Sequence, residues 1–149
     1  MGLRAVAWFK GYAAGLYLAR KATTPEAVLA LPGPKRLQLR MLVDVPAAEF
    51  VKAFHKGIAR NTPAAAQPAL AGRMQRFEAL VSSLRTVKAR DVVDLDFLPA
   101  EGLVFVHNGR TLGTPVEGED FYAALLRIFI GPRPVDAELK TGLLGGPVG

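Results

Sequence analysis

The dipeptide Asn108-Gly109, which lies between two short apolar runs, restricts the fold of this chain more than any other feature of its sequence. Asn-Gly readily adopts the positive φ angles of a type I′ turn, so residues 103–107 and 110–113 are predicted to form a β-hairpin. Residues 35–45 alternate apolar and polar side chains, which is typical of a strand with one buried face. Both patterns favour an antiparallel sheet that is covered on one side.

Segments in which apolar residues recur at helical spacing lie between the predicted strands. One further strand is predicted to end at Leu18, and another to cover residues 90–97. In the second of these, Asp94 and Asp96 are expected to face solvent. This order of elements predicts an α+β fold with the helices packed on one face of an antiparallel sheet. The predicted helices are residues 25–31, 47–60, 68–84, 118–130 and 136–140.

Length and composition limit the classes of protein to which the chain can belong. The 149 residues predict one domain at residues 1–144, followed by a flexible tail at 145–149. The net charge of +6 suits an anionic partner, but the basic residues are scattered, so nucleic-acid binding is not predicted. The absence of cysteine excludes disulfides and thiolate metal sites. No apolar run approaches the length of a membrane span.

Motifs for common catalytic and cofactor chemistry are missing from the sequence. It has neither a glycine-rich phosphate loop nor a nucleophile elbow, so no cofactor is predicted. His55 and His107 are the two histidines, and neither has an acidic residue at metal-ligand spacing. We therefore predict no metal site.

Arg4 and Tyr12 lie symmetrically about residue 8, and a tight hairpin there would place them opposite each other on two strands. A guanidinium and a phenol beside the small and apolar residues of the second strand suit the carboxylate of an amphipathic ligand. Spacing alone favours a simpler interpretation, in which Arg4 lies on the surface and Tyr12 is a half-buried core residue.

Three stretches form a recognisable series: Arg4 followed by residues 9–18, residues 31–36, and residues 121–140. In order and spacing they resemble the chalcone isomerase-like family, in particular its bacterial members. The resemblance implies an open-faced β-sandwich, in which an antiparallel sheet carries helices on one face and a ligand cleft lies between the two layers. Family members usually have further strands before the arginine, and bacterial members a signal peptide. We therefore expect a shortened domain, and its location, cytoplasmic or periplasmic, stays open.

The family contains isomerases that close chalcones to flavanones and a branch that binds fatty acids. The isomerases use an arginine, a strand threonine, a helix tyrosine and asparagine, and a late threonine or serine. Matched by motif, these five catalytic residues correspond to Arg4, Tyr12, Phe50, Gly57 and Ile128. Of the five residue types that the isomerases use, this chain therefore keeps only the arginine. The fatty-acid-binding branch holds the carboxylate with an arginine and a tyrosine, which Arg4 and Tyr12 match.

We therefore expect a protein that binds a fatty acid or a similar amphipathic carboxylate, without catalysis and without a cofactor. Arg4 and Tyr12 are expected to hold the head group. Two alternatives stay open: an intramolecular lyase with altered residues, and a structural or partner-binding module with a filled cleft. The oligomeric state is not predicted. The candidate cleft walls, which fit a plain core equally well, are Leu16, Phe50, Phe54, Phe77, Phe121 and Leu125.

Overall fold

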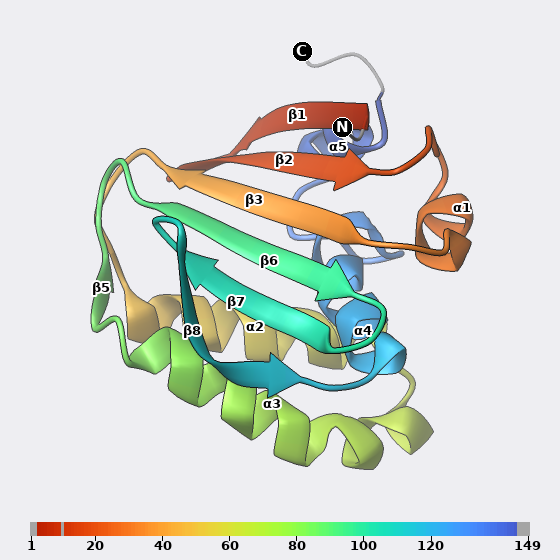
Figure 1. The fold of residues 1–149 in the computed structure, drawn as a ribbon. Helices are drawn as coiled ribbons and strands as arrows, with labels where there is room; N and C mark the ends of the chain where they lie inside the picture. Colours follow the sequence, from red (N-terminus) through yellow and green to blue (C-terminus); the bar gives the residue numbers. More distant parts are fainter. Residues whose placement is uncertain (1–2, 10, 146–149) are drawn as a thin grey trace.

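The computed structural model describes the backbone of residues 3–9 and 11–145 and the side chains of residues 11–145 (Figure 1). Its main feature is a six-stranded antiparallel sheet with the strand order β1-β2-β3-β6-β7-β8. Two very short strands, β4 (Val45–Pro46) and β5 (Thr86–Val87), form a separate pair. The strands of the large sheet are β1 Leu3–Phe9, β2 Tyr12–Leu18, β3 Lys35–Met41, β6 Val92–Leu98, β7 Gly102–His107 and β8 Arg110–Val116.

The helices cover one face of this sheet, and the other face is open (Figure 1). The second and fourth helices pack against each other, and the fifth packs against β1 and β2. This arrangement confirms the predicted α+β class and the antiparallel sheet with helices on one face. The helices are α1 Pro25–Ala30, α2 Ala47–Asn61, α3 Gln67–Ser82, α4 Glu119–Ile130 and α5 Ala137–Leu143, and a 3₁₀ turn, Ala64–Ala66, precedes α3.

Local signals in the sequence account for where several elements begin and end. Thr24 Oγ1 accepts a hydrogen bond from Ala27 N at 3.1 Å, so Thr24 caps α1 as its sequence predicts. Asn108 and Gly109 have φ angles of 50° and 82°, which confirms the predicted hairpin between β7 and β8.

The first hairpin differs from the prediction. Its strands pair Phe9 with Tyr12 and Arg4 with Tyr17, so Arg4 and Tyr12 are not cross-strand partners and the turn does not lie at residue 8. Gly11, with a φ of 88°, supplies the left-handed backbone that a tight connection after Phe9 requires. Tyr12 and Tyr17 are five residues apart on β2 and therefore face opposite sides of the sheet.

The core lies between the sheet and the helices. The alternation of β3 is confirmed, because Leu37, Leu39 and Met41 are buried, whereas Arg36 and Arg40 lie on the open face. Aromatic rings join the layers: the Phe77 ring centroid is 5.5 Å from that of Phe54 on α2 and 6.0 Å from that of Phe105 on β7. The core is therefore closely packed where α2 and α3 meet the sheet.

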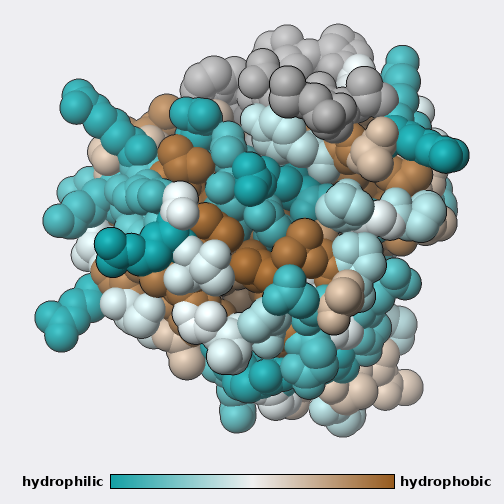
Figure 2. All heavy atoms as spheres, viewed as in Figure 1, coloured by the Kyte–Doolittle hydropathy of each residue, from teal (hydrophilic) through white to brown (hydrophobic). Residues whose placement is uncertain are grey.

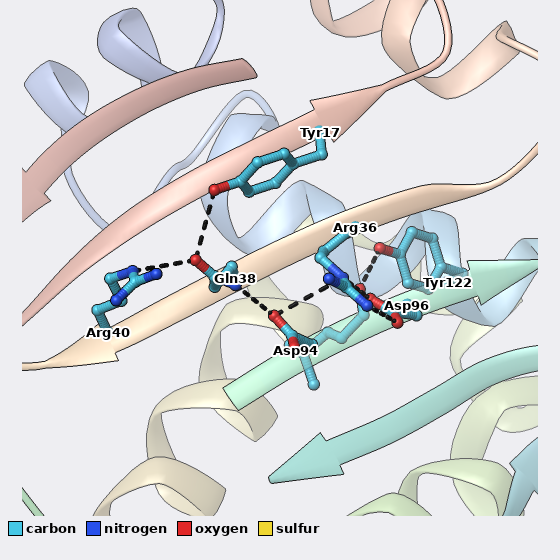
Figure 3. Close-up of polar contacts among 8 residues, drawn as sticks. Tyr17, Arg36, Gln38, Arg40, Asp94, Asp96 and Tyr122 are labelled. Atoms are coloured by element: carbon cyan, nitrogen blue, oxygen red, sulfur yellow. Dashed lines mark hydrogen bonds and ion pairs between the residues drawn. The ribbon is translucent and has the colours of Figure 1, made fainter. Parts of the chain in front are cut away.

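The open face carries a network of polar side chains across three strands (Figure 3). Arg36 donates two hydrogen bonds to Asp96, from Nε to Oδ1 at 2.8 Å and from Nη2 to Oδ2 at 2.9 Å. Gln38 Nε2 donates to Asp94 Oδ1 at 2.9 Å, and Tyr17 Oη donates to Gln38 Oε1 at 3.4 Å. Figure 2 shows this face as mostly hydrophilic, with a hydrophobic band across its middle.

The two aspartates of β6 are less accessible than their alternation predicts. They do lie on the open face, but Asp94 is only 6% exposed because its neighbours on β3 and β7 cover it. Burial raises the pKa of Asp94, and the hydrogen bond from Gln38 acts against this. The prediction that both carboxylates face solvent is therefore wrong for Asp94.

Candidate ligand pocket

An apolar pocket of about 160 Å³ lies between the start of β2, the middle of α2 and the end of α4. We call it the β2–α2–α4 pocket. Its only polar lining side chains among the described residues are those of Tyr12 and Glu49. The lining consists of Tyr12, Val45, Glu49, Phe50, Ala53, Phe54, Ile128, Phe129 and Val135.

Strand and helix periodicity bring the aromatic members of this lining together. Phe50 and Phe54 are four residues apart on α2 and therefore share its buried face. The Phe50 ring centroid lies 6.4 Å from that of Tyr12 on β2 and 5.7 Å from that of Phe54. Phe129 approaches from α4, with its ring centroid 6.2 Å from that of Phe54. The three elements thus form one aromatic wall.

The structure brings some of the predicted site residues together and separates others. Tyr12, Phe50 and Phe54 line the β2–α2–α4 pocket. The side chain of Arg4 lies outside the part of the chain whose side chains are described. The remaining candidates are enclosed in the core and do not line this pocket: Leu16, Phe77, Phe121 and Leu125.

The sequence analysis predicts a wall contribution from α4, but through Phe121 and Leu125 rather than through the residues that line the pocket, and it does not predict the segment after α4. Ile128, Phe129 and Val135 line the pocket more than seventy residues after the α2 aromatics. The apolar stripe of α4 predicts that Ile128 and Phe129 are buried. It does not predict their neighbours, because that requires knowing how α4 packs on α2.

One corner beside the pocket is filled by aliphatic atoms. A Cβ atom added to Gly57 would lie 2.8 Å from Cγ2 of Ile128, so the Ile128 side chain occupies the space above this glycine. By the family resemblance, an asparagine and a hydroxyl residue of the isomerases fall on these two positions. In this chain the same space holds no polar side chain from either of them.

The electrostatics of the pocket centre on Tyr12, which is 8% exposed. Burial raises the pKa of its phenol, and the nearby carboxylate of Asp136 raises it further. Tyr12 therefore keeps its proton at neutral pH and can donate a hydrogen bond. The exposed Glu49 at the rim of the pocket adds a second carboxylate to that of Asp136.

The pocket volume limits what it can hold without rearrangement. A dry apolar cavity of about 150 Å³ accommodates a molecule the size of benzene. Pockets for larger ligands usually enclose about 300–1,000 Å³. The β2–α2–α4 pocket therefore fits a short apolar segment, and a long chain requires an aromatic side chain to move or its end to extend outward past Val135.

Two larger hollows have a different character. One, of about 590 Å³, lies on the open face, where the Arg36 and Asp96 side chains are already paired. The other, of about 500 Å³, lies between α2 and α3, and its rim carries the His55–Glu78 pair with Nδ1 3.2 Å from Oε2. The β2–α2–α4 pocket, with aromatic and aliphatic walls and few polar groups, is closer to a small-molecule site.

Two searches of the described residues concern other kinds of site. Within residues 11–145, no group of three or more histidine and acidic side chains is arranged to hold a metal ion. Among the helices that the structure describes, none is long and apolar enough to cross a membrane.

Comparisons with known proteins agree with this fold. A family model described as chalcone isomerase-like matches residues 1–145. Among solved structures, the chain is similar to a fatty-acid binding protein of Arabidopsis thaliana, with a TM-score of 0.69 and 14% sequence identity. The match covers 97% of this chain and 85% of the plant protein, and at this identity the likeness is one of fold. A search of curated proteins finds none that matches.

Proposed function

Because the chain belongs to the chalcone isomerase-like family, we propose that it binds a fatty acid or a similar amphipathic carboxylate in the β2–α2–α4 pocket. The observation that carries this proposal is the junction of an aromatic wall with one buried, protonated phenol. The shared fold of the plant fatty-acid binding protein supports the same class of ligand.

Tyr12 holds the head group in this proposal. Tyr12 donates a hydrogen bond from its phenol, which suits a carboxylate acceptor. Asp136 and Glu49 place negative charge nearby, so an anionic head group needs a cation to offset them. The family resemblance assigns this role to Arg4, but β1 pairs Arg4 with Tyr17, which faces the other side of the sheet from Tyr12, so the strand register does not support that assignment.

The acyl chain lies against Phe50, Phe54 and Phe129, in the part of the pocket without polar groups. Each buried methylene contributes about 0.8 kcal/mol, so the first few carbons dominate the affinity. The head group then sets the direction in which the chain enters.

The side chains of the pocket and its surroundings favour binding without chemical conversion of the ligand. Stabilising a developing enolate requires hydrogen-bond donors aimed at the reacting oxygen. The positions that the resemblance equates with three donors of the isomerases carry Phe50, Gly57 and Ile128, none of which has a polar side chain. This favours a binding protein over an intramolecular lyase.

A calorimetric titration with straight-chain acids from butanoate to palmitate tests the proposal. We expect one site, with an affinity that rises roughly fourfold per methylene until the pocket is full and then levels off. The matching methyl esters are the control for the charge of the head group. Absence of saturable binding for every acid, or an affinity that does not depend on chain length, would contradict the proposal.

A further inference from the structure

Two large apolar side chains project from the turn that follows β3. Leu42 is 50% exposed and Val43 is 52% exposed, more than any other large hydrophobic residue of the described side chains. Two adjacent exposed aliphatic residues at the tip of a turn have no role in packing the core. Such residues commonly mark a surface that another molecule covers.

Hydrogen bonds hold this tip firmly in place. Arg90 N donates to Met41 O at 2.9 Å, and Met41 N donates to Asp91 O at 2.9 Å. Leu42 N donates to the carbonyl of Gly11 at 2.8 Å. The tip is therefore fixed between two neighbouring turns, and Leu42 and Val43 are exposed in a defined structure.

Basic side chains surround the tip. Lys88 and Arg90 are exposed on the turn hydrogen-bonded to it, Arg40 lies on the last part of β3, and Arg110 begins β8 at the same end of the sheet (Figure 1). This end of the sheet therefore presents four exposed cations beside two exposed aliphatic side chains.

The acidic groups beside this tip are engaged within the protein. Asp44 Oδ1 accepts a hydrogen bond from Ala89 N at 2.8 Å. Asp91 Oδ2 accepts from Lys88 N at 2.9 Å and lies 2.9 Å from His107 Nε2. The cations exceed the carboxylates here, so the end of the sheet carries net positive charge.

The apolar tip is continuous with the rim of the β2–α2–α4 pocket. A Cβ atom added to Gly11 would lie 3.6 Å from Cγ2 of Val43 and 4.0 Å from Cγ2 of Val45. Val45 and Tyr12, which flank this contact, line the pocket. A surface that covers the tip thus comes close to the pocket.

We propose that this end of the sheet docks on a lipid bilayer that contains anionic lipids. Leu42 and Val43 insert between the head groups, while Lys88 and Arg90 bind lipid phosphates. A bilayer accepts a small protruding tip without a matching cavity, whereas a stable protein interface needs about 800 Å² on each partner. Docking would bring the pocket to lipid from which an amphipathic carboxylate can enter; this last step rests on the proposed function.

Sedimentation of the full chain with vesicles, without added fatty acid, tests the docking. We use vesicles of phosphatidylcholine alone and of phosphatidylcholine mixed with phosphatidylglycerol. We expect binding to the mixed vesicles that weakens with added salt, because exposed charges are screened. The Leu42→Ser/Val43→Ser double variant is expected to bind these vesicles about tenfold more weakly or worse.

Leu98→Ser is the matched control, because Leu98 is also an exposed aliphatic residue. It ends β6 and lies at the other end of the sheet from Leu42 and Val43. This variant is expected to bind vesicles like the wild type, whereas Lys88→Glu/Arg90→Glu is expected to lose the preference for phosphatidylglycerol. If the wild type does not bind mixed vesicles, the docking on a bilayer is overturned. This result is expected if the surface binds a protein partner instead. Equal binding by the Leu42→Ser/Val43→Ser variant also overturns the docking.

A fatty-acid titration without vesicles separates this docking from the proposed function. The Leu42→Ser/Val43→Ser variant keeps every residue of the pocket lining, so it is expected to bind a fatty acid like the wild type. If the wild type binds vesicles but does not bind a fatty acid, the proposed function is contradicted while the proposed docking is supported.

Discussion

Tyr12 combines two properties: its ring is part of an aromatic wall, and its phenol is buried and protonated. We expect Tyr12→Phe to bind decanoate about tenfold more weakly, because it loses a hydrogen bond to a charged acceptor. Calorimetric titration measures the change. Tyr17→Phe is the matched control, since Tyr17 lies on the same strand but hydrogen-bonds Gln38 on the open face. Equal affinities for Tyr12→Phe and the wild type would contradict this assignment.

Asp136 lies close enough to Tyr12 to raise its pKa, so its carboxylate also opposes a bound anion. Asp136→Asn removes the charge and preserves the cap of α5, because asparagine also accepts the hydrogen bond from Leu139 N. We expect the variant to bind decanoate up to about fivefold more tightly, the size of a partly exposed charge interaction. Its affinity for decanol is expected to stay the same. A tighter complex with decanol as well would mean that the effect is not electrostatic.

The residues of the candidate site are only partly predictable from the sequence. Tyr12, Phe50 and Phe54 were predicted as site residues from resemblance and helical spacing, and the structure places them around one pocket. Leu16 and Phe77 have the same apolar character but are enclosed in the core, because sequence does not show which buried residue borders an empty space. Asp94 alternates like a solvent-facing residue and is nevertheless covered by its neighbours on adjacent strands.

At the scale of elements, a cluster around Asp91 joins the turn before β6 to the hairpin of β7 and β8. Asn108 Nδ2 donates to Asp91 Oδ1 at 3.0 Å, and Asn108 Oδ1 accepts from Val92 N at 2.8 Å. Burial raises the pKa of Asp91, but hydrogen bonds from His107, Asn108 and Lys88 N outweigh it and lower the pKa to about 2. The ionised carboxylate therefore stabilises the folded protein.

This cluster gives a pH dependence of stability with a defined sign. Because the folded pKa of Asp91 is below its ordinary value of 3.8, its contribution is full above about pH 4 and is lost as the pH falls towards 2. We expect Asp91→Asn to unfold at lower urea concentration than the wild type at pH 6. Urea unfolding of both proteins is measured at each pH. The difference between their unfolding free energies is expected to become smaller as the pH is lowered from 4 to 3. A difference that stays constant over this range would contradict the role of the ionised carboxylate.

The elements with local signals were predicted well, and those that depend on distant pairing were not. The Asn108-Gly109 hairpin and the capped helix α1 are encoded within a few residues, and both are confirmed. The first hairpin was placed wrongly, because symmetry between Arg4 and Tyr12 carries no information about the turn, whereas the φ of Gly11 does. The sequence does not predict strands β4 and β5, because a two-residue strand shows no periodicity and each of these strands is defined by its pairing with the other.

For the whole molecule, the one-sided sheet explains why the β2–α2–α4 pocket and the exposed Leu42 and Val43 lie at the same end. Helices α2 and α4 close most of the covered face and leave the β2–α2–α4 pocket where β2 begins. The turns at that end carry Leu42 and Val43 on the outside. Neither feature follows from the net charge or composition, because both depend on how segments distant in sequence meet.

Blocking the pocket from its rim tests most directly whether it is the ligand site. Ala53 and Ala48 are both exposed residues of α2, but only Ala53 lines the pocket. A calorimetric titration with decanoate compares Ala53→Trp, Ala48→Trp and the wild type. We expect Ala53→Trp to lose affinity about tenfold or more, as its indole displaces several methylenes of the ligand, and Ala48→Trp to bind like the wild type. Undiminished binding by Ala53→Trp would contradict the pocket as the site of binding.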